Sequence, residues 1–159
     1  MCLLILLFIC AAATPALAGP YEDANAAYDG GDYATAVRTY RSLAENGEAR
    51  AQNNLCVMYS YGMGVSQDYE AAMLWCRKAA NQGSPYSQYN LGRMYYDVAE
   101  MPKDYVQAYK WFNLAAASTD KTQRGVAMKY RDLVAAQMTA AQIAEAQKLA
   151  REWKPTPGK

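Results

Sequence analysis

The sequence lacks histidine altogether and has only four cysteines among its 159 residues, and both shortages limit its chemistry. Without an imidazole there can be no Ser-His-Asp relay, no histidine general base and no zinc site with histidine ligands. The sequence also lacks a large net charge of either sign, because it has 16 basic and 15 acidic residues. No strong field therefore attracts a nucleic-acid backbone or an anionic membrane, and we expect neither as a partner.

The N-terminus carries the longest apolar run, from Leu3 to Ala13, and Ala16-Leu17-Ala18 then places small residues where a signal peptidase cuts. A membrane anchor would need about 20 apolar residues, and Phe8-Ile9 is too bulky for a lipoprotein signal. We predict a signal peptide over residues 1–18, cut after Ala18, and a periplasmic or secreted protein without stable membrane insertion. A cytoplasmic regulator that is not exported is the weaker alternative.

The remaining chain repeats itself every 36 residues. An Asp-Tyr pair recurs at Asp32-Tyr33, Asp68-Tyr69 and Asp104-Tyr105, and an alanine follows each tyrosine three positions later. The second and third units share further pairs, among them Gln52/Gln88, Asn54/Asn90, Leu55/Leu91, Met58/Met94 and Trp75/Trp111. A fixed period of this length is typical of repeat architectures.

Within a unit the apolar residues follow a helical spacing. Ala51, Leu55 and Met58 fall on one face, and a second helical pattern begins at Tyr69 after a break at Gly62–Gly64. Each unit is therefore a helical hairpin, and neighbours must stack because one hairpin cannot bury its apolar face alone. We predict an all-α fold, a right-handed α/α solenoid of stacked antiparallel hairpins that forms a single domain. The expected hairpins span residues 21–46, 47–83, 84–118 and 119–153, and a flexible tail follows at 154–159.

These motifs resemble the Sel-one-like repeat (SLR), a relative of the tetratricopeptide repeat. The resemblance rests on AQNNLCVMY at 51–59, on GMGVSQDY at 62–69 and on the following Ala72 and Trp75, and it extends from Tyr21 to Thr119. It implies an all-helical scaffold or adaptor without catalytic chemistry. The third unit departs from the pattern at Val98–Glu100, which replaces Gly62–Gly64, so we expect a loop of different shape there.

Cys56 and Cys76 are the two cysteines that remain after signal cleavage. In cysteine-rich members of the family that the repeat resembles, cysteines at the positions of Gln52 and Ala80 bridge the two helices of a hairpin. The present pair lies one turn nearer the loop, and the resemblance implies a disulfide in an oxidising compartment. Two free thiols packed as small core residues are the alternative. Because Cys56 replaces the glycine seen at Gly92, the contact between these two helices should widen or change.

The resemblance also implies where a ligand binds, because the first helix of each hairpin lines the concave side of such arrays. The matching positions are Arg50, Asn53, Val57, Ser60 and Tyr61 in the second unit and Tyr86, Tyr89, Arg93, Tyr96 and Asp97 in the third. Tyrosine and arginine are favoured at binding hot spots. Our candidate ligand-binding residues are Asn53, Tyr61, Tyr86, Tyr89, Asn90, Arg93 and Tyr96. The amides of Asn54 and Asn90 could equally have an internal role, a hydrogen bond to a carbonyl of an inter-helix loop, and some tyrosines must serve packing.

Two functions agree with these observations. The first is a non-catalytic exported adaptor that binds a protein or an extended peptide in the concave groove. The alternative is a protein or enzyme of the cell envelope that binds cell-wall glycan or glycopeptide, with tyrosines stacked on sugar faces. Asp68 and Asp104 belong to helix starts and not to a catalytic pair, and we expect no catalytic residues, metal or cofactor.

Overall fold

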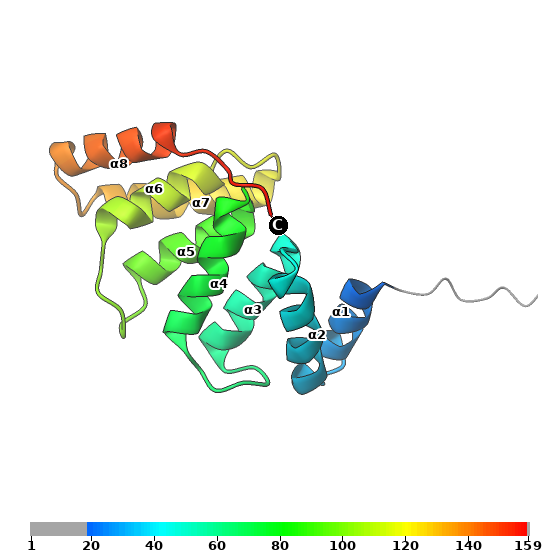
Figure 1. Cartoon of the computed structure of the whole chain (residues 1–159). Coiled ribbons are helices and arrows are strands. Elements are labelled where there is room, and N and C mark those ends of the chain that lie inside the picture. The colour runs from blue at the N-terminus through cyan, green and yellow to red at the C-terminus, as the bar shows by residue number, and fades with distance from the viewer. Residues whose placement is uncertain (1–18, 159) are drawn as a thin grey trace, which may run out of the picture.

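A computed structural model describes residues 19–158, and the predicted signal peptide, residues 1–18, lies outside the described part of the chain. Helices and short connections make up these residues, without a strand among them. The helices are α1 (Pro20–Asp29), α2 (Tyr33–Glu45), α3 (Ala49–Tyr61), α4 (Tyr69–Asn81), α5 (Pro85–Tyr96), α6 (Tyr105–Ala115), α7 (Lys121–Ala135) and α8 (Ala140–Glu152). The hairpins α1/α2, α3/α4 and α5/α6 stack in chain order into a curved array (Figure 1). The expected all-α solenoid is confirmed.

The aspartate of each Asp-Tyr pair starts the second helix of its hairpin. The side chains of Asp32, Asp68 and Asp104 each accept a hydrogen bond from the backbone N–H three residues later, at 2.9–3.0 Å. Such a cap satisfies one of the backbone donors that a helix start leaves free. The acidic residue thus has a local structural role in every unit, which is why it recurs with the period.

Buried glutamines join one hairpin to the next. Gln52 Nε2 donates to the carbonyl of Ala44 at 3.0 Å, and Gln88 Nε2 donates to the carbonyl of Ala80 at 3.3 Å. Both glutamines are only 3% exposed, and each accepting alanine lies near the end of the preceding second helix. Each of these carbonyls also accepts a hydrogen bond from a backbone N–H of the following turn, Gly47 or Gly83, so the glutamine adds a second bond that ties the two hairpins together.

Small residues let the two helices of a hairpin approach each other. The structure joins Cys56 and Cys76 in a disulfide with Cα atoms 5.1 Å apart, as the resemblance implied. The positions 36 residues later are Gly92 and Phe112, and a Cβ built on Gly92 would lie 2.8 Å from the Phe112 ring. A covalent bond in the second unit therefore occupies the place where the third unit packs a ring over a glycine.

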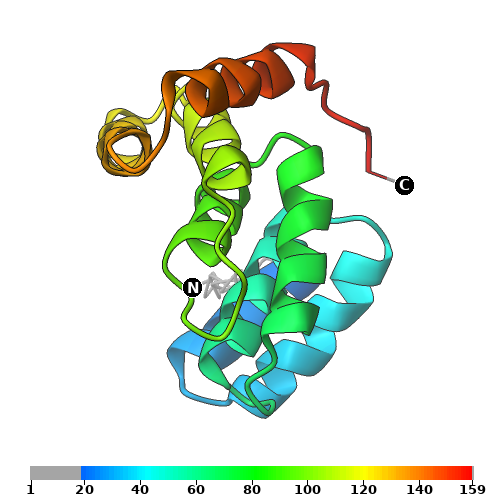
Figure 2. The same ribbon diagram turned by 90° about the vertical axis from the view of Figure 1, so that its left-hand side faces the viewer.

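The fourth hairpin does not form as predicted. Both α7 and α8 pack on α6, and α8 runs away from α7 toward the C-terminus (Figure 2). At the end of α8, Trp153 packs on Trp111 with ring centroids 6.3 Å apart, whereas Leu133 of α7 is 45% exposed. At the position of Cys56 and Gly92, α7 carries Met128, and a larger side chain at a helix contact holds the two axes farther apart.

The segment after α8 also differs from the expected loose tail. It returns along the array to the end of α4, where the Thr156 N–H donates to the Asn81 carbonyl at 2.8 Å. Thr156 and Gly158 line a cavity of about 390 Å³ together with Gln52 and Gln82 of the second hairpin. The tail thus covers the glutamine joint between the first two hairpins.

Candidate functional site

The first helices of three hairpins line two adjoining cavities. The α3–α5 pocket, about 290 Å³, lies between these two helices and the loop that follows α5. Its lining residues are Cys56, Val57, Ser60, Tyr61, Tyr69, Asn90, Arg93, Met94, Asp97, Val98, Ala99 and Glu100. The α1–α3 pocket, about 340 Å³, is lined by Tyr21, Asn25, Tyr28, Asp29, Tyr40, Asn54 and Val57. Because Val57 lines both pockets, they adjoin at this residue, and we refer to the two together as the groove.

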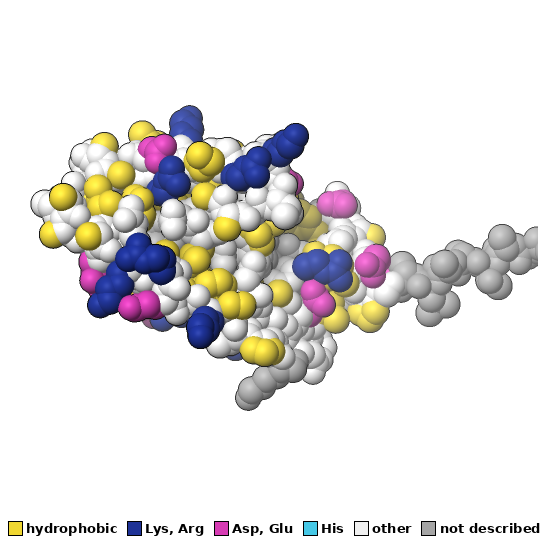
Figure 3. Space-filling view, turned by 90° about the horizontal axis from the view of Figure 1, so that it is seen from above, with side chains coloured by type: hydrophobic (Ala, Val, Ile, Leu, Met, Phe, Trp, Pro, Cys, Tyr) yellow, Lys and Arg dark blue, Asp and Glu magenta, His cyan; other side chains and the backbone are white. Residues whose placement is uncertain are grey.

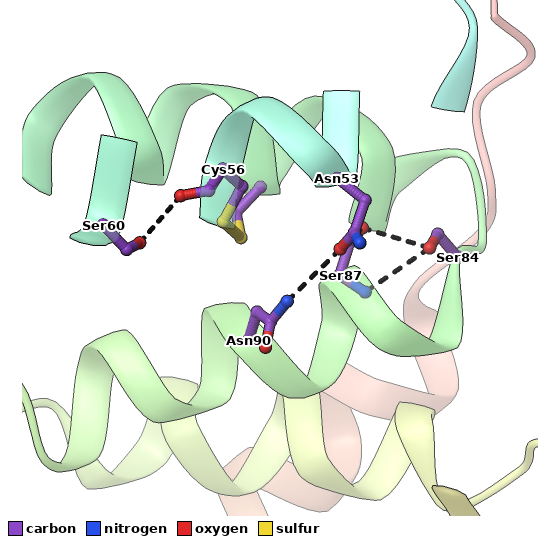
Figure 4. Close-up of a disulfide and its surroundings, with 7 residues drawn as sticks. Asn53, Cys56, Ser60, Ser84, Ser87 and Asn90 are labelled. Atoms are coloured by element: carbon purple, nitrogen blue, oxygen red, sulfur yellow. Dashed lines mark hydrogen bonds between the residues drawn. A yellow bond between two sulfur atoms is a disulfide. The ribbon is translucent and has the colours of Figure 1, made fainter. Parts of the chain in front are cut away.

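A polar network crosses from α3 to α5 beside the pocket. Asn53 Oδ1 accepts a hydrogen bond from Ser87 Oγ at 2.8 Å and another from Asn90 Nδ2 at 3.2 Å (Figure 4). One repeat earlier, Asn54 Nδ2 donates in the same way to Tyr21 Oη at 3.3 Å. The two repeated asparagines therefore have the internal role that the sequence left open. Their partners are side chains of the preceding first helix rather than loop carbonyls.

Charged and aromatic side chains line the rest of the α3–α5 pocket. Arg93 donates from Nε and Nη2 to one carboxylate oxygen of Asp97, at 3.1 and 3.0 Å, so that these two charges offset each other. Glu100 lies across the same pocket, and Tyr61 is 63% exposed beside it. The pocket thus offers an aromatic face, an ion pair and an additional carboxylate around an apolar lining.

The structure gathers part of the predicted set at this pocket. Tyr61, Asn90 and Arg93 line it, and Asn53 lies next to it through its bonds to Ser87 and Asn90. These residues come from the ends and middles of two neighbouring helices, and stacking of the hairpins brings them together. The concave positions carried over from the repeat family therefore predict a real cluster of side chains on α3 and α5.

The other three candidates lie elsewhere. Tyr89 packs against both Phe112 and Tyr130, with ring centroids 5.7 and 5.4 Å away, and burial beside the Tyr130 side chain raises its pKa to about 12. Tyr96 packs on Tyr105 at 6.1 Å. Tyr86 is exposed, and its hydroxyl donates to a carboxylate oxygen of Asp120 at 3.3 Å. Their contacts run toward α6 and α7 because those helices pack on the C-terminal side of α5.

Several lining residues come from the loop after α5, which sequence reasoning did not assign to the site. Gly62 and Gly64 of the preceding unit adopt positive φ values of 67° and 70°, whereas no residue of the later loop does so. The later loop instead places Val98, Ala99 and Glu100 at the pocket. In the sequence, the sign of this difference is the replacement of Gly62 and Gly64 by Val98 and Glu100. This replacement predicted a loop of different shape, as found, but not that the loop borders the groove.

Neither a cluster of metal-ligating side chains nor an apolar membrane span is found among residues 19–158. The cysteine, aspartate and glutamate side chains of these residues do not gather in groups of three or more that could hold a metal ion. None of the helices in this part of the chain combines the length and the apolar character that crossing a bilayer requires.

Comparison with known proteins gives a consistent result. The family model described as Sel1 repeat matches residues 49–84 and 85–120, which are α3/α4 and α5/α6 with their connections. The protective antigen c5321 of uropathogenic Escherichia coli, which displays an SLR fold, is 30% identical over 84% of this chain, with a TM-score of 0.77. This chain covers 29% of that antigen. The Sel1 repeat protein from Oxalobacter formigenes is 32% identical, with a TM-score of 0.59 over 69% of this chain and 86% of that one. No match was found among curated proteins.

Proposed function

Because this chain belongs to the Sel1 repeat family, whose members commonly mediate protein interactions, we propose that it is an exported, non-catalytic scaffold. In this proposal it holds an extended segment of a partner protein along the groove of α1, α3 and α5. The observation that carries the proposal is the pair of adjoining pockets that share Val57.

The dimensions of the groove favour a peptide chain over a compact ligand. Each pocket is at the lower end of the range for small-molecule sites, which is about 300–1,000 Å³. An extended peptide advances about 3.3 Å per residue, so one segment that runs across the first helices can place successive side chains in both pockets.

The Cys56–Cys76 disulfide supports the exported location. Disulfides persist in oxidising compartments such as the periplasm and are reduced in the cytosol. The predicted signal peptide requires the same compartment. N-terminal sequencing of the protein from a periplasmic or culture fraction should begin at Gly19, and a chain that begins at Met1 in the cytosolic fraction would contradict export.

Peptide selection tests the groove directly. The purified chain is used to select binders from a phage-displayed library of random 12-residue peptides, and the selected peptides are measured by fluorescence polarisation. Val57→Arg places a long charged side chain where the two pockets meet and should weaken binding at least tenfold. Leu74→Arg is the matched control, because Leu74 is a large exposed residue on the second helix α4.

The result that contradicts the groove is equal binding to the wild type and to the Val57→Arg variant. Circular dichroism of both variants must show the same helicity, so that a lost signal does not reflect unfolding. Pelleting with purified peptidoglycan tests the alternative ligand in the same variants. Sedimentation with peptidoglycan that is lost only in Val57→Arg would favour the glycan over the peptide.

A further inference from the structure

Helix α7 leaves open a face that the other first helices cover. Cys56 of α3 and Gly92 of α5 are buried against the second helix of their hairpin, but Met128, at the same position of α7, is 41% exposed. Gln88 is buried as well, whereas Arg124, 36 residues later, is exposed. The face is open because α8 packs on α6 instead of α7, which leaves α7 at the edge of the molecule (Figure 2).

The charge around this face limits what can cover it. Four basic residues lie on α7, and the single acidic one, Asp132, pairs with Arg131 at 2.8 Å. Lys121 and Arg124 lie on the face of Met128, seven and four residues before it, and Lys129 lies at the edge of that face. All three are exposed, and no ion pair with them is found among the described residues. Two α7 helices would repel each other, so a symmetric pairing of this face is disfavoured. An acidic partner helix matches the positive charge of this face.

Such a helix lies at the other end of the array. Helix α1 carries Glu22, Asp23 and Asp29, all exposed, and no basic residue. Ala26 is exposed on the same side, four residues after Glu22 and three before Asp29, since residues at these spacings share a helix face. Figure 3 shows acidic side chains at the α1 end of the molecule and most of the visible basic ones toward the other end.

Shape agrees with charge. Within the hairpin α5/α6, the side chain of Phe112 packs over the small Gly92. Met128 and Ala26 offer the same combination of a large and a small residue. Basic side chains flank Met128, and acidic side chains flank Ala26. We propose that α7 of one molecule docks on α1 of a second copy of this chain. Such an interface is heterologous, because each molecule uses a different surface, so association continues beyond a dimer unless it closes into a ring.

Sedimentation equilibrium of the purified chain tests this proposal. The average mass should rise with protein concentration past that of a dimer at low salt, and it should fall at about 1 M salt, where charges are screened within about 3 Å. Arg124→Glu with Lys129→Glu reverses the charge of α7, and Glu22→Lys with Asp23→Lys reverses that of α1. Each double variant alone should remain monomeric at concentrations where the wild type associates.

Mixing the two double variants is the decisive step, because the reversed α7 of one then faces the reversed α1 of the other. Association should return in the mixture. Lys148→Glu with Arg151→Glu changes exposed basic residues of α8 and is the matched control, which should associate as the wild type does. A wild type that stays monomeric up to millimolar concentration would overturn the proposal. So would association that survives either reversal, or a mixture of correctly folded variants that remains monomeric.

Discussion

The sharpest test of the packing inside a hairpin is Gly92→Ala. The added Cβ would lie 2.8 Å from two carbons of the Phe112 ring, which is fully buried, so the ring or the helix must shift. Overpacking of this kind costs about 1–3 kcal/mol. The substitution also brings a gain, because alanine in a helix interior is about 1 kcal/mol more favourable than glycine. The net change is therefore small, and a single measurement would not separate the two effects.

Gly125→Ala supplies the matched control. Gly125 also lies inside a helix, α7, but a Cβ there would meet no atom within 4 Å. This variant receives the helix-propensity gain alone and should be stabilised by about 1 kcal/mol. The difference in unfolding free energy between the two variants isolates the clash and should be about 1–3 kcal/mol, with Gly92→Ala the less stable.

Urea denaturation followed by circular dichroism measures both values, with the disulfide kept intact. Phe112→Leu in the Gly92→Ala background removes part of the ring and should reduce the difference caused by the added methyl group. Equal stabilisation by Gly92→Ala and Gly125→Ala would refute the reasoning, because it would mean that no close contact exists between α5 and α6 at Gly92.

Three further predictions concern the buried Gln52, the Cys56–Cys76 disulfide and the buried hydroxyl of Tyr40. Gln52→Leu removes two hydrogen bonds of the buried glutamine, one to the Ala44 carbonyl and one from Gln82 Nε2, and should lower the free energy of unfolding by about 1–3 kcal/mol, measured in urea. Reduction of the Cys56–Cys76 bond, which closes a loop of 20 residues, should cost about 3 kcal/mol in the same assay, and a Cys56→Ser variant should lose its sensitivity to reductant. Burial raises the pKa of Tyr40 from 10.0 to about 12, so folding favours its neutral form. Its contribution to stability should be complete below pH 10 and lost as the pH rises toward 12, and Tyr40→Phe should reduce this loss in urea titrations at several pH values.

The parts of the fold that sequence reasoning predicted are those that depend on short-range patterns. Asp68 and Asp104 cap helices through a bond to the third following residue, so their effect is local and repeats with the chain. The spacing of apolar residues such as Leu55 and Leu91 likewise decides which face of a helix is buried. The boundaries of the first three hairpins follow from these two signals.

The candidate site was predicted only in part, because one residue type can serve two purposes. A tyrosine at a concave position binds a ligand or packs on the next helix, and nothing local separates Tyr61, which is exposed, from Tyr89, which lies against Phe112 and Tyr130. The contacts that decide the role of Tyr89 come from Phe112 of α6 and Tyr130 of α7, which are both far from Tyr89 in the sequence. Asn90 shows the same ambiguity, since its amide bonds to Asn53 and still lines the pocket.

The end of the array follows from one position of the repeat. Small side chains on the first helix let the second helix approach closely, and Cys56 and Gly92 are small whereas Met128 is not. With that pairing blocked, α8 buries Ala146 on α6 and stacks Trp153 on Trp111, so the chain keeps a core but loses the hairpin. The same substitution exposes the basic face of α7. The large residue thus lies where the regular stacking ends, on the surface that we propose receives a second molecule.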